Sequence, residues 1–181
     1  MNPDILRLYL VTDQSLMRGR PLADMVAAAV EGGVSCVQLR EKHLATREFL
    51  AQALLLKELM AQHRVPLVTH DRIAIALACA AHGVHLGHSD LPVADPRPLL
   101  PPSVFIGLAV EPLNEVRQSF ALPLDYLCVS PIFAPPTITD TNMPVAWKAC
   151  PVDVASSHLP LVAIRGLHAA TAVEVLLAEA A

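Results

Sequence analysis

The sequence lacks the features that mark membrane, secreted or nucleic-acid-binding proteins. Although 54% of its residues are hydrophobic, no run approaches the ~20 apolar residues that a membrane-spanning helix needs. Residues 1–4 have neither the basic start nor the apolar stretch of a signal peptide. The net charge is −4 and no basic run is present, which argues against a general nucleic-acid binder. We therefore expect a cytoplasmic protein with no membrane or nucleic-acid partner.

The cysteines and histidines also lack the spacing of a metal or redox motif. The four cysteines lie far apart, and none belongs to a CxxC pair. The eight histidines are scattered and include no HExxH motif. We expect free, mostly buried thiols in a reducing cytoplasm.

The chain instead alternates strand-like and helix-like segments. Short apolar runs predict strands at residues 6–12, 34–39, 66–71, 83–88, 104–110, 126–130 and 160–164. Apolar residues at helical spacing predict helices at 22–30, 47–62, 73–81 and 170–180, a helix that begins at Pro112, and one turn near 95–100.

This alternation predicts an α/β fold with a parallel sheet and external helices. Strands recur roughly every 20 to 30 residues, as in a TIM (β/α)₈-type barrel, and we expect a single domain over residues 1–181. Only seven strands are evident, so the predicted barrel is incomplete at the C-terminus. Its open edge would favour a homo-oligomer. A doubly wound sheet is the alternative, but no GxGxxG motif follows the first strand.

Polar residues gather where the predicted strands end, which is where ligands bind in such barrels. Arg40 offers a planar fork of donors and Lys42 a mobile point charge, and both suit phosphate. Asp71 and Asp90 end consecutive strands and could share a magnesium ion with phosphate oxygens. Asp71 could instead cap the following helix, and Asp90 could be a turn residue. The full set of strand-end residues is Asp13, Arg40, Lys42, His70, Asp71, Asp90, Glu111, Ser130 and Arg165.

Several sequence blocks resemble the thiamine phosphate synthase and TenI family. They are YLVTD at 9–13, GVSCVQLREK at 33–42, GVHLG at 83–87 with DLP at 90–92, DY at 125–126, PIF at 131–133 and PLVAI at 160–164. The blocks occur in order over nearly the whole chain. The resemblance implies a TIM barrel that joins hydroxymethylpyrimidine diphosphate to thiazole phosphate, giving thiamine phosphate and diphosphate.

The resemblance also implies roles for individual residues. Magnesium and cationic side chains would stabilise the diphosphate that leaves in a dissociative reaction. The diphosphate substrate would be bound by Gln38, Arg40 and Lys42, with His70 beside them, and Mg²⁺ by Asp71 and Asp90. The thiazole phosphate would meet Thr137, Arg165 and the backbone near Gly166. The candidate catalytic residues are Arg40, Lys42 and Glu111.

The chain also departs from the family pattern. His70 replaces an asparagine, and Ala109 and Glu111 replace a serine and a polar residue such as histidine. Ile138 stands where the family has a lysine, and Arg165 where it has a glycine. The eighth strand is absent from the predicted elements. The magnesium–diphosphate half of the site is therefore better preserved than the thiazole-phosphate half.

Three functions remain open. The favoured one is a synthase, a transferase acting on small phosphate and diphosphate substrates. The second is a TenI-like protein that binds or isomerises a thiazole, with Glu111 as its acid or base. The third is a degenerate, non-catalytic binding module.

Overall fold

Among the residues that the computed structural model describes, seven parallel strands follow one another in chain order. The structure describes residues 1–87, 90–110, 118–130, 132, 157–165, 167–168 and 172. The strands form one sheet, and each strand pairing described is parallel. Their bounds are β1 Tyr9–Val11, β2 Cys36–Leu39, β3 Leu67–His70, β4 Gly83–Leu86, β5 Phe105–Val110, β6 Tyr126–Val129 and β7 Leu161–Ala163. A sequential parallel sheet was predicted, and the structure confirms it.

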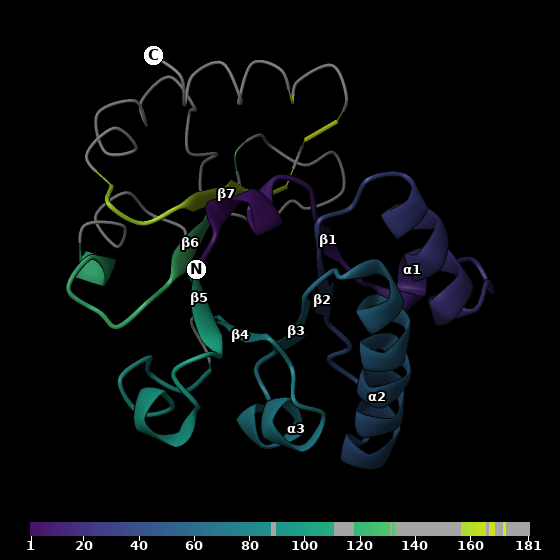
Figure 1. Cartoon of the computed structure of the whole chain (residues 1–181), viewed down its shortest axis with the longest axis horizontal. Helices are drawn as coiled ribbons and strands as arrows, with labels where there is room; N and C mark the ends of the chain where they lie inside the picture. The colour runs from purple at the N-terminus through teal and green to yellow at the C-terminus, as the bar shows by residue number, and fades with distance from the viewer. Residues whose placement is uncertain are drawn as a thin grey trace. The chain divides into compact units, whose positions relative to one another are not determined.

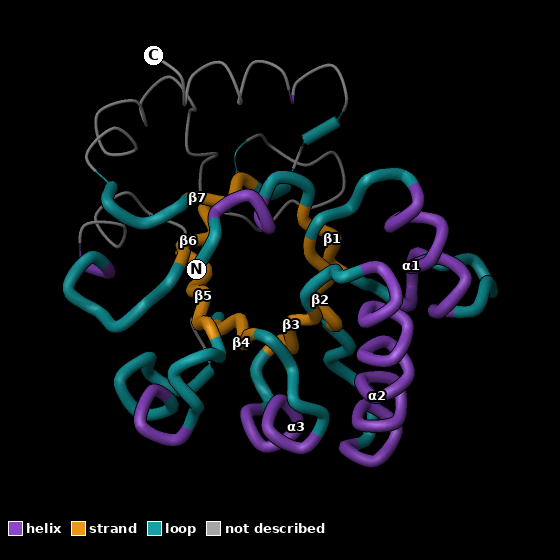
Figure 2. The backbone as a smooth tube through the Cα atoms, in the orientation of Figure 1, coloured by secondary structure: helices purple, strands orange, loops and turns teal. Residues whose placement is uncertain are grey.

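Helices and 3₁₀ turns connect the strands. The α-helices described are α1 Leu22–Glu31, α2 Thr46–His63 and α3 Ile73–Ala78, and the 3₁₀ helices are η1 Pro3–Leu6, η2 Gln14–Leu16 and η3 Arg97–Leu99. Figures 1 and 2 show α1, α2 and α3 on the outer side of strands β1 to β4. None of the helices among the described residues has the length and apolar composition of a membrane-spanning segment.

The contacts divide the chain into two compact units. The first unit comprises Met1–Leu86 and Asp90–Ile106, and the second comprises Gly87–Ser89 and Gly107–Ala181. In the first unit, α2 packs against α1, α3 and β3. Its buried face contains Phe49, Ala53, Leu56 and Met60, the four residues that helical spacing predicted. Apolar side chains four or three positions apart share one helix face, and burying that face stabilises the helix.

Three of the strands are buried along their whole length. All four residues of β2, β4 and β6 are buried, as a parallel sheet requires. In the second unit, Tyr126 is fully buried, and its ring occupies the space beside Gly107 where a side chain would otherwise lie. The predicted free thiols are confirmed for Cys36, Cys79 and Cys128, all buried; Cys150 lies outside the described residues.

Some element boundaries differ from the prediction. The first strand was expected from residue 6, but residues Pro3–Leu6 form η1. Pro3 has a φ angle suited to a turn, and the side chain of Asn2 accepts a hydrogen bond from the Asp4 amide. The third helix ends at Ala78 rather than residue 81, because Ala80 adopts a left-handed φ of 50°. Most of the helices expected from Pro112 and at 170–180 lie outside the described residues.

Candidate active site

The end of β2 supplies three of the predicted ligand-binding side chains, all in the first unit. Gln38 is buried, and its Nε2 donates a hydrogen bond to Nδ1 of His70 over 3.2 Å. Arg40 follows the strand half-buried, with its Nη1 4.0 Å from Oδ2 of Asp13. Lys42 is exposed in the turn that follows. Two cationic side chains, Arg40 and Lys42, thus follow the buried Gln38 amide at the end of β2.

His70 ends β3 and lies within the electrostatic reach of four charged residues. Burial is the main cause that lowers the pKa of His70. The neighbouring carboxylate of Asp90 raises this pKa, whereas the cations of Arg40 and Lys42 lower it, and Asp71 raises it. Both predicted anion-binding cations and both predicted metal-binding carboxylates therefore act on the charge state of one imidazole ring.

The contacts of His70 define its neutral form. Because the amide nitrogen of Gln38 can only donate, Nδ1 of His70 accepts and its proton lies on Nε2. That Nε2 lies 3.8 Å from Oδ2 of Asp90. The ring also stacks on His85, with 6.1 Å between the ring centroids. His70 was predicted as a substrate-binding residue, and its position links Gln38 to Asp90.

Asp71 occupies a turn with unusual backbone geometry. Its φ is 50°, and its amide donates to the carbonyl of His85 over 2.8 Å. The hydroxyl of Thr69 donates to the Asp71 carbonyl over 3.3 Å. The alternative interpretation of Asp71 as a helix cap is wrong: Arg72 occupies the N-cap position of α3, and no side chain caps that helix. The Asp71 carboxylate therefore does not cap the N-terminus of α3.

The carboxylates of Asp71 and Asp90 fit one kind of metal site. In the described part of the chain, no group of three or more His, Cys, Asp or Glu side chains could hold a metal ion. A metal site built from protein alone is therefore not present among these residues. Magnesium, however, is commonly held by one or two carboxylates, with substrate phosphate oxygens and water completing the shell. Asp71 and Asp90, whose charges both raise the pKa of His70, are the carboxylates available for that arrangement.

The remaining predicted site residues belong to the second unit. Arg165 is exposed and has a φ of 70°, the left-handed geometry that glycine adopts most readily. The turn thus has the backbone conformation expected where the family has glycine. Arg165 follows β7. Burial raises the pKa of the Cys128 thiol of β6, and the charge of Arg165 lowers it to a smaller extent. The predicted residues Glu111, Thr137 and Gly166, and also Ile138, lie outside the described residues.

Sequence reasoning missed two polar residues that support this region. Thr12 and Glu41 are 3% and 7% exposed, and they are hydrogen-bonded to each other over 3.1 Å. Their types and spacing gave no signal, since a glutamate between an arginine and a lysine usually lies on a solvated surface.

Comparison with known proteins gives a consistent result. The family described as thiamine monophosphate synthase matches residues 8–181. The thiamine-phosphate synthase of Albidiferax ferrireducens is 62% identical over 97% of this chain and 80% of its own length. That of Vibrio parahaemolyticus is 42% identical over 90% of this chain and 79% of its own length.

Solved structures agree on the fold. The thiamine phosphate pyrophosphorylase of Pyrococcus furiosus matches with a TM-score of 0.88 and 32% identity, over 97% of this chain and 83% of that one. A 3-hexulose-6-phosphate synthase matches with a TM-score of 0.57 at 14% identity, over 86% of this chain and 79% of that one, and shares the fold alone. The predicted TIM-type α/β fold is confirmed. From residue 8 to residue 181, this chain belongs to the thiamine monophosphate synthase family.

Proposed function

We propose that this protein is a thiamine-phosphate synthase. It joins hydroxymethylpyrimidine diphosphate to thiazole phosphate and releases diphosphate. The observation that carries the proposal is the environment of His70: its Nε2 lies 3.8 Å from Oδ2 of Asp90, and the charges of Arg40, Lys42 and Asp71 also act on the pKa of its ring. Names of relatives up to 62% identical support it. Two cations and two carboxylates at strand ends are what a metal–diphosphate complex requires.

The reaction needs stabilisation of a leaving group more than it needs a strong base. The bond between the pyrimidine methylene carbon and the diphosphate oxygen breaks, and the electron pair leaves with diphosphate. The ring nitrogen of the thiazole then supplies the electron pair for the new carbon–nitrogen bond. Arg40 and Lys42 stabilise the negative charge that develops on the departing oxygen. The same two side chains bind the substrate.

Asp71 and Asp90 would hold Mg²⁺ in this proposal. When bound, the ion neutralises diphosphate oxygens and supports their departure. The contribution of the protein is to present both carboxylates beside a neutral imidazole. The amide nitrogen of Gln38 donates to His70, and the side-chain oxygen of Gln38 is the acceptor that this proposal assigns to the pyrimidine.

Residues of the second unit would bind the second substrate. Thr137, Arg165 and the backbone near Gly166 are assigned to the thiazole phosphate. Glu111 is kept as a candidate catalytic residue, and because no proton moves in the steps above, its role as acid or base belongs to the TenI-like alternative. An exposed guanidinium in a left-handed turn offers a bidentate contact to phosphate. In this proposal Arg165 would thereby replace the backbone contact of the family's glycine.

Calorimetric titration with hydroxymethylpyrimidine diphosphate, with and without Mg²⁺, tests the first half of the proposal. We expect binding that requires Mg²⁺ in the wild type and is lost in Asp71→Asn, a variant whose side chain tolerates the positive φ. Asp24→Asn is the matched control because Asp24 is exposed on α1, a helix that carries none of the residues assigned to the site. Turnover with thiazole phosphate tests the second half. Metal-independent binding of a thiazole without turnover would favour the TenI-like alternative instead.

A further inference from the structure

Glu41 is a buried carboxylate between the two cations assigned to the diphosphate. It is 7% exposed, whereas Arg40 is half-buried and Lys42 is exposed. Removing a carboxylate from water is unfavourable unless hydrogen bonds satisfy it. The hydrogen-bond partners of the Glu41 carboxylate therefore indicate why it is buried.

Those partners tie the end of β1 to the end of β2. Oε1 of Glu41 accepts a hydrogen bond from the Thr12 hydroxyl over 3.1 Å, and Oε2 accepts from the Gln14 amide over 3.3 Å. The Thr12 hydroxyl oxygen in turn accepts from the Arg40 amide over 3.0 Å. The Thr12 amide donates to the Gln38 carbonyl over 3.0 Å. The chain of contacts thus ends at the backbone of Arg40.

The carboxylate determines which way the Thr12 hydroxyl points. A hydroxyl has one proton to donate, and the Thr12 hydroxyl donates it in the hydrogen bond to the Glu41 carboxylate. The lone pairs of the oxygen then remain available to the Arg40 amide. Among the described residues, Arg40 has an ion pair with Asp13 and none with Glu41. Glu41 therefore acts on the Arg40 backbone through Thr12, without neutralising the guanidinium.

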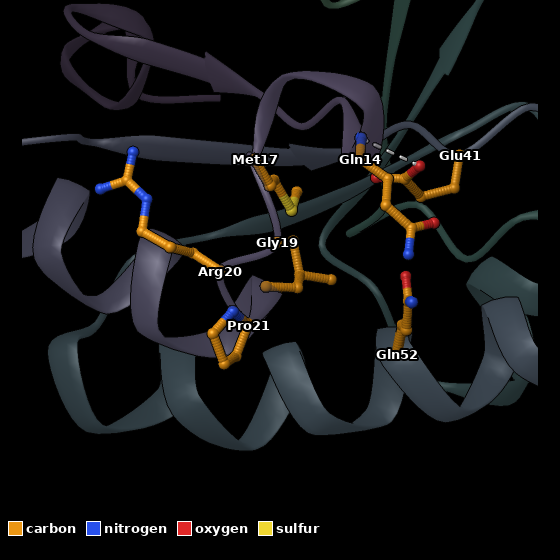
Figure 3. Close-up of a pocket in the computed structure, with 8 residues that line it drawn as sticks. Gln14, Met17, Gly19, Arg20, Pro21, Glu41 and Gln52 are labelled. Atoms are coloured by element: carbon orange, nitrogen blue, oxygen red, sulfur yellow. Dashed lines mark hydrogen bonds between the residues drawn. The ribbon is translucent and has the colours of Figure 1, made fainter.

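A pocket lies beside Glu41, and water in it can replace some of the contacts that a Glu41 variant loses. The pocket has a volume of about 220 Å³, and its lining includes Gln14, Glu41 and Gln52. Figure 3 shows the Gln14 and Gln52 side chains pointing toward one another beside the Glu41 carboxylate. Space of this size admits water. Water in this pocket can therefore hydrate the Thr12 hydroxyl and the Gln14 amide when Glu41 is truncated.

We propose that Glu41 is a positioning residue for the diphosphate site, acting through Thr12 to fix the Arg40 backbone. Glu41 itself contacts neither the substrate nor the metal in this assignment. The inference rests on the proposed function for the nature of the anion. A lost hydrogen bond in a charged network corresponds to about tenfold in affinity.

The experiment measures the affinity of inorganic diphosphate in the presence of Mg²⁺, together with KM for each substrate, kcat and the melting temperature. We expect Glu41→Ala and Thr12→Val to weaken diphosphate binding about tenfold and to raise KM for the pyrimidine substrate. KM for thiazole phosphate should stay near the wild-type value. Glu41→Gln and Thr12→Ser keep the acceptor and the hydroxyl, and should retain most of the affinity.

Two comparisons separate positioning from general destabilisation. The exposed Glu58 of α2 provides the matched control Glu58→Ala, which should bind diphosphate like the wild type. The double variant Thr12→Val, Glu41→Ala should lose no more affinity than the weaker-binding single variant, because both changes break one chain of contacts. Unchanged diphosphate affinity in both single variants would overturn the inference while leaving the proposed function intact. Absence of diphosphate binding by the wild type would overturn both.

Discussion

His70 connects Gln38 to Asp90 through its two ring nitrogens. Nδ1 accepts a hydrogen bond from Nε2 of Gln38 over 3.2 Å, and Nε2 lies 3.8 Å from Oδ2 of Asp90. One neutral ring thus contacts a residue assigned to the pyrimidine substrate and a residue assigned to the metal. This arrangement gives the histidine a structural role at the position where the resemblance implies an asparagine.

Replacing His70 tests that linking role. His70→Leu leaves the buried Gln38 amide without its ring partner, which typically costs roughly 1–3 kcal/mol. We expect pyrimidine diphosphate to bind about 10 to 100 times more weakly at pH 7.5. His70→Asn keeps a neutral polar group and should stay within about tenfold of the wild type. Calorimetric titration of both variants gives the comparison. Equal losses in the two variants would show that ring size, not hydrogen bonding, matters.

Acid should destabilise the protein through its buried histidines. Burial is the main cause that lowers the pKa of His85 to about 3, and burial also lowers the pKa of His70 and His82. The unfolded chain binds these protons near pH 6.5, above the folded values. The free energy of unfolding should therefore fall as the pH drops from 6.5 toward 3, by roughly 1.4 kcal/mol per pH unit for one such proton.

Urea unfolding at pH 7, 6 and 5 measures this dependence. His85→Gln should give a shallower decline than the wild type, because the titrating ring is removed. His63→Gln is the control, since His63 is exposed at the end of α2, and its curve should parallel that of the wild type. An unchanged decline in His85→Gln would contradict the assignment to His85.

The buried thiols should resist alkylation in the folded protein. Burial raises the pKa of Cys36 and of Cys128 to about 12, and burial also raises the pKa of Cys79. Since the thiolate is the reactive form, iodoacetamide at pH 8 should leave these residues unmodified until urea is added. Peptide mass mapping with and without urea locates the modified positions. Rapid native labelling of Cys36 would contradict the burial of β2.

Gly83 should tolerate no side chain. A Cβ at this position would collide with the Phe105 ring, and forcing extra volume into a packed core typically costs 1–3 kcal/mol. We expect Gly83→Ala to lower the melting temperature. Adding Phe105→Leu should recover part of that loss, because the aliphatic side chain removes the ring from the contact. If the effects of the two changes simply add, the ring is not the obstacle.

Local patterns predicted the strands and the α-helices of the first unit. The face of α2 formed by Phe49, Ala53, Leu56 and Met60 follows from helical spacing alone. The apolar run that ends in Gln38, Arg40 and Lys42 likewise marked the end of a parallel strand. Boundaries were less predictable: the first strand was expected from residue 6, but Leu6 is the last residue of η1 and β1 begins at Tyr9.

The roles of Asp71, His70 and Glu41 depended on contacts between segments distant in the sequence. A cap by Asp71 was plausible from local spacing, but the Asp71 amide is held by the His85 carbonyl, and α3 begins without a side-chain cap. His70 meets Gln38 across 32 positions, and Glu41 meets Thr12 across 29. The sequence by itself determined the alternation of buried strands and helices, because hydrophobic periodicity is a local property. Only the tertiary structure decided which polar groups are buried together, because a hydrogen bond between strand ends exists only after the strands have paired.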